Sequence, residues 1–353
     1  MSDIQMNESY HDRLQHIDAL RGFAMMLVVF VHIELFGVFE FTHTTLLAKM
    51  FSAVHMPLFF FISGLCIYRP NKTYNRSRIY GDIKRLILPA LSIGLLYTYF
   101  KINQDFVYFF SNNMKSGYWF TISLFEILLI YYLISNITKS SSKGFLTSLC
   151  AGALFLYLLR LPLKISPMAT MIADYLCFHQ TCSYFLYFVL GVFASKYKGV
   201  VSVWITSRWF PTVAILVFTI FSYLMFVFLP RFGVYGITGQ VVESIGETLV
   251  GISGLAILYI TFDRYKLFFN NNNIVGKCLI IIGNNTLAIY LLHYFLLPHL
   301  PLIGNCIKDS SNVLCELIII IPLSLLIIFL SFLVAKVIRL SPILGKILLG
   351  DKG

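Results

Sequence analysis

The first hydrophobic segment carries ionisable side chains that a lipid-embedded helix does not ordinarily hold. Arg21 and His32 lie eleven residues apart, close to three helical turns, so a helix places both on one face about 16 Å apart along its axis. Asp18 lies one turn before Arg21 and within its reach. Because ionisable groups inside a membrane helix are costly, the set predicts a functional polar track facing protein or water. Taken singly, each residue also fits an arginine that reaches the membrane surface or a hydrogen-bonded core histidine.

A second segment places a histidine beside a proline. His55 precedes Pro57 by two residues, and Ser63 and Gly64 follow. Pro57 frees a backbone carbonyl and is expected to kink the helix, which opens space beside His55. Gly64 permits close contact with another helix. The alternative is a packing kink with a hydrogen-bonded histidine.

Glu126 is a carboxylate that no residue of its own segment neutralises. It therefore requires a partner from another span, and His32 and His55 lie at comparable predicted depth. Trp119, near the start of the same segment, is expected to anchor that end at the membrane interface.

A polar stripe runs along a late apolar segment. Thr286, Tyr290 and His293 recur at intervals of four and three residues, directly after Asn285. This spacing places the three side chains on one helical face. They either serve a polar site or hydrogen-bond neighbouring helices.

The composition is that of a polytopic all-α membrane protein. Hydrophobic residues make up 58% of the 353 residues, charged residues only 12%, and the mean hydropathy is +0.80. A soluble domain of this length has far more polar surface. The net charge of +11 does not indicate nucleic acid binding, because the positive residues lie in short loops. The seven cysteines are scattered, and neither they nor the histidines have metal-ligand spacing.

About ten transmembrane helices are expected. The predicted spans are 17–39, 46–68, 86–100, 119–135, 145–159, 171–195, 209–229, 245–262, 281–300 and 313–335. An even number places both termini on one side. Lys and Arg concentrate in loops on that side, most densely in 69–86, so both termini are expected in the cytoplasm. The predicted domains are a cytoplasmic N-terminal tail (1–16), one transmembrane domain (17–338) and a cytoplasmic C-terminal tail (339–353).

Four stretches of the sequence resemble the integral-membrane acyltransferase-3 family. The residues His-Met-Pro-Leu-Phe of the second stretch are similar to those of the fucose-acetylase-type branch. The stretches are Ile17-Asp18-Ala19-Leu20-Arg21-Gly22, with ten residues between Arg21 and His32, His55-Met56-Pro57-Leu58-Phe59-Phe60-Phe61-Ile62-Ser63-Gly64, Tyr118-Trp119-Phe120, and Gly283-Asn284-Asn285-Thr286-Leu287-Ala288-Ile289-Tyr290-Leu291-Leu292-His293. The resemblance implies ten core helices, a cytoplasmic acyl-CoA donor, an acceptor on the far side, and Arg21 and His32 as the functional pair.

The sequence departs from the family at its second basic motif, two arginines with three residues between them. Arg85 matches the second arginine by its distance to Pro89, but Gly81 occupies the position of the first. The segment still contains Arg78 and Lys84, and cationic side chains are suitable contacts for the phosphates of coenzyme A. Arg21, Arg78, Lys84 and Arg85 are therefore the predicted acyl-CoA-binding residues.

The resulting hypothesis is an acyl-CoA-dependent O-acyltransferase of the bacterial inner membrane. It is expected to transfer an acyl group, with acetyl as the expected group, to a cell-envelope glycan or glycolipid. His32, Arg21 and Glu126 are the predicted catalytic residues. The supporting residues are Asp18, His55, Ser63, Trp119, Asn285, Thr286, Tyr290 and His293. Acetyl-CoA is the expected co-substrate, without a metal. Expected partners are acyl-CoA, the acceptor, the lipid bilayer and other copies of the chain, but no nucleic acid. The alternative is a transporter or flippase of a polar solute or lipid-linked glycan, which would use the same residues as a solute path.

Overall fold

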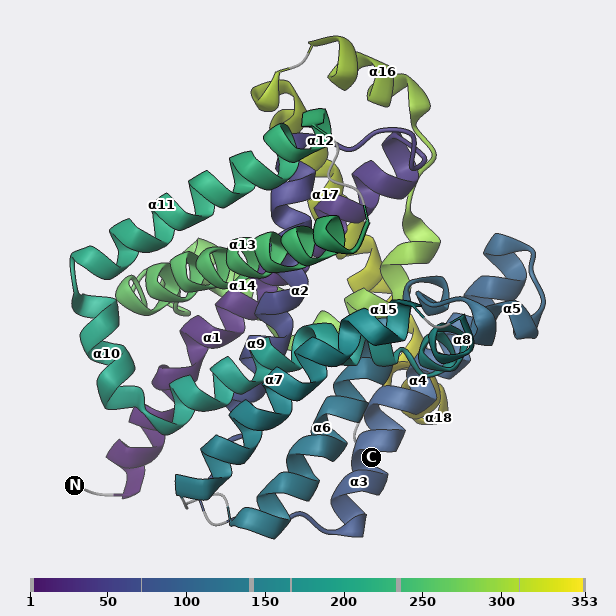
Figure 1. Cartoon of the computed structure of the whole chain (residues 1–353). Coiled ribbons are helices and arrows are strands. Elements are labelled where there is room, and N and C mark those ends of the chain that lie inside the picture. Colours follow the sequence, from purple (N-terminus) through teal and green to yellow (C-terminus); the bar gives the residue numbers. More distant parts are fainter. Residues whose placement is uncertain are drawn as a thin grey trace. The chain divides into compact units, whose positions relative to one another are not determined.

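The computed structural model describes residues 3–70, 72–139, 143–165, 167–232, 236–310 and 312–351. These residues form helices and no strand, which confirms the predicted all-α class (Figure 1). Residues 1–2 and 352–353, the ends of the two predicted tails, lie outside the described ranges. The chain divides into two compact units: unit 1 contains 1–59, 197–286 and 297–330, and unit 2 contains 60–196, 287–296 and 331–353.

Unit 1 is organised around the first helix, α1. This helix packs against α14 and α13, and α11 lies along α13 (Figure 1). The elements of this unit are α1 (Asp3–His32), η1 (Ile33–Val38), the first part of α2 (Leu46–Ile67), α10 (Lys198–Thr206), α11 (Trp209–Tyr223), η5 (Leu224–Phe228), α12 (Leu229–Phe232), α13 (Gly236–Arg264), α14 (Ile274–Asn284), α16 (Pro301–Ser310) and most of α17 (Val313–Ile338).

Unit 2 is organised around α6, α7 and α9, which pack against one another. The C-terminal helix α18 packs against α4, so the predicted C-terminal tail is in part a packed helix. Besides the last part of α2 and the end of α17, the elements are α3 (Arg76–Asp82), η2 (Ile83–Ile87), α4 (Leu88–Tyr97), η3 (Thr98–Ile102), α5 (Phe106–Ser111), η4 (Lys115–Gly117), α6 (Trp119–Thr138), α7 (Lys143–Ile165), α8 (Pro167–Leu176), α9 (Phe178–Lys196), α15 (Thr286–Leu296) and α18 (Pro342–Leu349).

Glycines set the closest helix contacts in both units. In unit 1, a Cβ atom on Gly283 would lie 1.9 Å from the carbonyl oxygen of Asp18, and one on Gly22 would lie 2.0 Å from that of Leu279. In unit 2, a Cβ atom on Gly64 would lie 2.0 Å from the carbonyl oxygen of Phe188. Only glycine permits this backbone approach, which is typical of membrane helices. Gly64 therefore has the predicted role.

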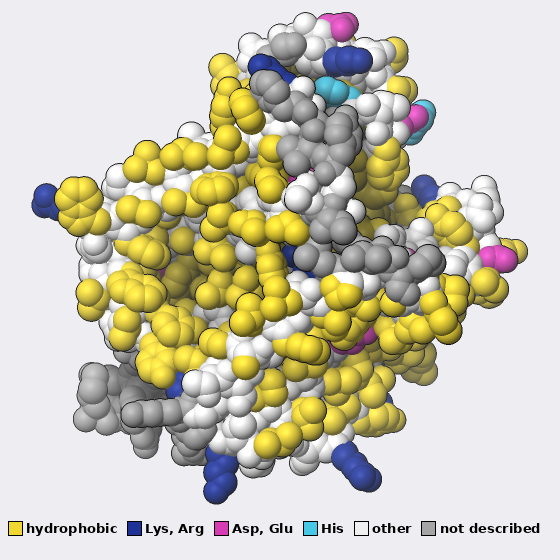
Figure 2. Space-filling model, viewed as in Figure 1, with side chains coloured by type: hydrophobic (Ala, Val, Ile, Leu, Met, Phe, Trp, Pro, Cys, Tyr) yellow, Lys and Arg dark blue, Asp and Glu magenta, His cyan; other side chains and the backbone are white. Residues whose placement is uncertain are grey.

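Seven helices are long and apolar enough to span a membrane within the described residues, or up to nine if each of two bent helix pairs forms one span. A shorter apolar helix, Gly144–Arg160, lies where the fifth span was predicted. Hydrophobic side chains cover most of the visible face, and Lys and Arg are sparse on it (Figure 2). These features are those of a multi-pass membrane protein.

The structure differs from the predicted spans at three places. The third helical stretch covers Arg76–Ile102 and not 86–100, so most of the expected basic loop is helical. The sixth span is broken at Cys177 with a bend of 62°, and the ninth is broken at Asn285 with a bend of 82°. Apolar periodicity identifies the segments but does not reveal these breaks, because a single non-helical residue leaves the hydrophobic pattern intact.

The glycine contacts predict a position-specific loss of stability. Gly283→Ala and Gly64→Ala each force a methyl group onto a backbone carbonyl, so each should lower the free energy of unfolding by about 1–3 kcal/mol, the usual cost of overpacking. Thermal unfolding of the purified protein in detergent measures this loss. Gly199→Ala is the matched control, because nothing lies within 4 Å of its added Cβ atom. Equal melting temperatures for all three variants would contradict the close contacts.

Candidate active-site residues

Two histidines of unit 1 lie near each other, one at the end of α1 and one in the middle of α2. The ring centroids of His32 and His55 are 6.5 Å apart. His55 is buried, and its Nδ1 atom lies 2.8 Å from the carbonyl oxygen of Phe51. Because a carbonyl only accepts, Nδ1 carries the proton, and in the neutral ring Nε2 is left as the basic nitrogen. The pair has the chemistry to accept a proton.

The predicted contact between Arg21 and Asp18 is present near the middle of α1. The Arg21 Nη1 atom lies 3.0 Å from Asp18 Oδ1, and both side chains are about a quarter exposed. The backbone of Asp18 faces Gly283 of α14, so the glycine of the Gly-Asn-Asn-Thr stretch brings the second helix against this ion pair. The presence of glycine at position 283 is therefore explained by close packing between α1 and α14, and not by a turn in the backbone at Gly283.

Asn285 and Thr286 form the break between α14 and α15. The Asn285 side chain donates to the carbonyl oxygen of Ile281 at 2.9 Å, and Thr286 donates to that of Gly283 at 3.2 Å. Both bonds satisfy carbonyl groups at the end of α14, as terminal side chains commonly do. These two residues shape the bend of the broken segment.

Arg78 in unit 2 is held by two neighbouring side chains. Its Nε atom lies 3.2 Å from Asp82 Oδ2 and donates to the Tyr132 hydroxyl at 3.2 Å. Tyr132 in turn donates to Asp82 Oδ2 at 2.6 Å. The Asp82 side chain is 6% exposed, whereas that of Arg78 is 41% exposed. The guanidinium is thus held by its inner edge, and within the described residues its two terminal nitrogens make no hydrogen bond, which suits an external anion.

The segment before α3 is tied to α6 beside this arginine. The Tyr74 amide donates to the Asn136 side chain at 2.9 Å, and the Asn136 amide group donates back to the Tyr74 carbonyl at 2.7 Å. The Tyr74 and Tyr132 rings stack with centroids 4.3 Å apart. These contacts fix the position of Tyr132, and through it that of Arg78.

The other two predicted cations of this segment, Lys84 and Arg85, are exposed. Lys84 lies with its Nζ atom 4.3 Å from the centroid of the Tyr80 ring. Arg85 is exposed on η2, and its backbone carbonyl lies 2.5 Å from a Cβ atom built on Gly350, just after α18. The C-terminal helix therefore covers part of the backbone at Arg85.

Glu126 has a neutral partner, contrary to the expected histidine. Thr181 of α9 donates to its Oε2 atom at 2.6 Å. Trp119 is also not an interfacial anchor, since it is 8% exposed and stacks on Tyr184 with centroids 5.3 Å apart. Both corrections have one cause: α6 packs against α9, and sequence alone does not identify a helical neighbour. Ser63, on α2, is half-buried.

The polar residues Thr286, Tyr290 and His293, predicted to lie on one helical face, have different partners. Tyr290 donates to the carbonyl oxygen of Gly117 at 2.8 Å. His293 is fully buried, and its Nδ1 atom lies 3.0 Å from the Ile289 carbonyl of its own helix. As in His55, this arrangement leaves Nε2 as the basic nitrogen of the neutral ring. Thr286, the first residue of α15, bonds locally.

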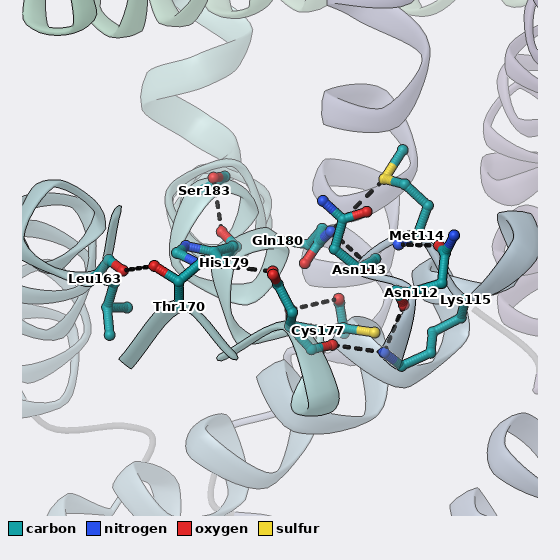
Figure 3. Close-up of polar contacts among 12 residues, drawn as sticks. Asn112, Asn113, Met114, Lys115, Leu163, Thr170, Cys177, His179, Gln180 and Ser183 are labelled. Carbon is teal, nitrogen blue, oxygen red and sulfur yellow. Dashed lines mark hydrogen bonds and ion pairs between the residues drawn. The ribbon is translucent and has the colours of Figure 1, made fainter. Parts of the chain in front are cut away.

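A strained turn around Lys115 precedes α6 (Figure 3). Lys115 and Ser116 both have positive φ, 46° and 53°, which is costly for residues with side chains. The Lys115 ammonium is buried and donates to the carbonyl oxygens of Asn112 at 2.7 Å, Phe110 at 2.8 Å and Asp174 at 2.5 Å. Burial lowers the pKa of Lys115, and the three carbonyl groups offset the loss of water around the charge. One cation thus joins the turn to α8.

The structure groups the predicted residues within each unit. Unit 1 contains Asp18, Arg21, His32, His55, Asn285 and Thr286, and unit 2 contains Ser63, Arg78, Lys84, Arg85, Trp119, Glu126, Tyr290 and His293. Sequence analysis missed Asp82, Tyr132 and Lys115. The four-residue spacing between Arg78 and Asp82 is a sequence signal for Asp82. The contacts of Tyr132 and Lys115 depend on long-range packing.

The chain matches the acyltransferase-3 family of acyltransferase domains over residues 14–336. It therefore belongs to this family, and the acyltransferase class predicted from its motifs is confirmed. No curated protein and no solved structure matches the chain.

The Lys115 contacts predict a large structural effect. Lys115→Met removes the donor to three carbonyl groups, and hydrogen bonds to charged groups contribute about 1.5–3 kcal/mol each. The variant should therefore lose on the order of 3 kcal/mol or more of stability in thermal unfolding. Lys101→Met, at an exposed lysine of η3, is the control and should unfold like the wild type. An unchanged Lys115→Met protein would show that the three contacts are not essential.

Proposed function

We propose that this membrane acyltransferase transfers an acetyl group from cytoplasmic acyl-CoA to a hydroxyl group of a cell-envelope glycan or glycolipid in the bacterial inner membrane. The observation that carries the proposal is the neighbouring His32 and His55 rings, 6.5 Å apart by their centroids, in a chain of the acyltransferase-3 family. An ionisable pair inside candidate spans is expensive and points to function.

The chemistry requires a proton acceptor. A sugar hydroxyl is a poor nucleophile at neutral pH, so a base must take its proton as the oxygen attacks the thioester carbonyl. The carbon–sulfur bond then breaks, the ester forms, and the CoA thiolate leaves and takes up a proton. His32 is proposed as this base or as a transient acyl carrier. His55, with Nδ1 held by Phe51, presents a fixed basic nitrogen to support it.

The anionic end of the donor requires cations. Arg78 supports this role best, because Asp82 and Tyr132 hold its inner edge and leave the terminal nitrogens for phosphate. Lys84 and Arg85 lie on the following turns and add exposed positive charge. Arg21 is proposed to act along α1, where three turns to His32 match the reach of a pantetheine arm. The cytoplasmic side follows from the Lys and Arg distribution.

The competing function is transport of a polar solute or lipid-linked glycan. Purified protein incubated with radiolabelled acetyl-CoA and envelope glycan separates the two. Acyl transfer with release of CoA thiol supports the enzyme, whereas solute flux into liposomes without CoA supports the transporter. The stronger support for the enzyme is its family membership.

His32→Ala should lower the rate of acyl transfer at least about a hundredfold, the usual scale for a positioned base. Product formation and thiol release are measured with protein of verified fold. His299→Ala is the matched control, because His299 is an exposed histidine paired with Glu40 at 2.7 Å. Near-normal turnover of the His32 variant would exclude this residue from the mechanism.

Arg78→Ala should raise the KM for acetyl-CoA by roughly tenfold or more, since a charge-assisted hydrogen bond contributes about 1.5–3 kcal/mol. The KM for the acceptor should remain nearly unchanged. Neutralising Lys84 and Arg85 together should weaken donor binding further. Arg208→Ala, an exposed arginine of another predicted cytoplasmic loop, serves as the control. An unaltered KM for acetyl-CoA in the Arg78 variant would place the nucleotide elsewhere.

A further inference from the structure

Two carboxyl groups of unit 1 are buried against each other. Glu34 is fully buried and Glu316 is 3% exposed. They come from η1 and from the first turn of α17, and Thr45, just before α2, lies between them. The Thr45 hydroxyl oxygen is 3.0 Å from Glu34 Oε2 and 2.9 Å from Glu316 Oε1. Both carboxyl groups therefore contact the same hydroxyl oxygen.

The hydrogen bonds around Thr45 require a proton on the pair. The Thr45 oxygen accepts from the Ala48 amide at 3.0 Å, and its hydroxyl has one proton to donate. That proton satisfies the contact with one carboxylate. The contact with the other carboxyl group is a hydrogen bond only if that group is itself protonated and donates. Two ionised carboxylates in one buried site also repel each other strongly, so sharing one proton is the stable state.

No cation in the described part of the chain neutralises this pair. On α16, which packs against η1, the charged and titratable groups are Cys306, Lys308 and Asp309. On the end of α1, the following loop and the first half of α2 they are His32, Glu40, His43, Lys49 and His55, and Cys315 precedes Glu316 on α17. The side-chain hydrogen bonds of Glu34 and Glu316 are with Thr45. Glu40 instead pairs with His299. Among these residues, no cation therefore replaces the proton in neutralising the charge of Glu34 and Glu316.

We propose that Glu34 and Glu316 form a proton-sharing pair that positions His32. Glu34 follows His32 by two residues, in a π-helical turn that continues α1. Thr45 begins the helix that carries His55, because its side chain accepts from Ala48 in the first turn of α2. The pair thus joins the end of the His32 helix to the start of the His55 helix and to α17. This role rests on the proposed function of His32, but the shared proton does not.

A shared proton has a defined consequence for pH dependence. The folded protein binds a proton that free glutamates of the unfolded chain release in the acidic range, so its stability should fall as the pH rises through ionisation of the pair. The second carboxylate then repels the first, and the contact through Thr45 is lost. The rate of acyl transfer should decline over the same pH range, by about tenfold per pH unit for one proton.

Glutamine substitutions test the pair, because an amide group imitates a protonated carboxyl group but does not ionise. Melting temperature and kcat are measured against pH for the wild type, Glu34→Gln and Glu316→Gln. Each single variant should fold at neutral pH and lose this pH-dependent decline in melting temperature and kcat, while the KM for acetyl-CoA stays unchanged. Glu40→Gln is the matched control and should keep the wild-type profiles. Thr45→Val should lower the melting temperature at neutral pH.

The result that overturns the shared proton is a wild-type pH profile of melting temperature in both glutamine variants. Marked destabilisation of both at neutral pH would also contradict it, because it would show that two ionised carboxylates are needed. If the melting profiles change as expected but kcat does not, the pair exists and its positioning of His32 is wrong. If the purified wild type shows no acyl transfer, the proposed function fails and the melting profiles still test the shared proton.

Discussion

The structure depends on a constraint that a membrane protein cannot avoid: a polar group removed from water needs a partner within the protein. The charged and basic side chains of the candidate spans follow this constraint in different ways. Arg21 contacts Asp18, His55 contacts a carbonyl oxygen of its own helix, and Glu126 accepts from Thr181. Each contact fixes the orientation of a side chain as well as satisfying its polar group.

Departures from regular helix carry a second set of polar groups. The turn at Lys115 precedes α6 and supplies the Gly117 carbonyl to Tyr290. The break at Asn285 separates α14 from α15, and the π-helical turn Ile33–Val38 follows His32 directly and contains Glu34. Irregular backbone at membrane depth is tolerated where protein surrounds it, and π-turns often mark functional positions. These breaks place side chains where a straight helix does not.

Much of this arrangement was predictable from sequence, and the exceptions have physical reasons. Hydrophobic segments, Gly64 as a packing residue and the contact of Asp18 with Arg21 follow from local spacing, because helix geometry determines them. The partner of Glu126, the burial of Trp119 and the Thr45 bridge between Glu34 and Glu316 depend on which helices become neighbours. Sequence periodicity contains no such information, since one apolar face fits many partners. The bends at Cys177 and Asn285 were missed because one residue leaves the apolar pattern unchanged.

The basic segment shows why spacing alone is insufficient for a site as well. The family pattern directs attention to position 81, which is glycine here, and a Cβ atom on Gly81 meets nothing within 4 Å. One turn earlier, Arg78 is fixed by Asp82 and Tyr132. The π-helical turn Ile83–Ile87 then changes the angle per residue, so Arg85 does not keep the direction that α-helical counting from Arg78 assigns to it. Contacts with Asp82 of its own helix and Tyr132 of another helix, and not the interval between arginines, therefore determine how Arg78 is held.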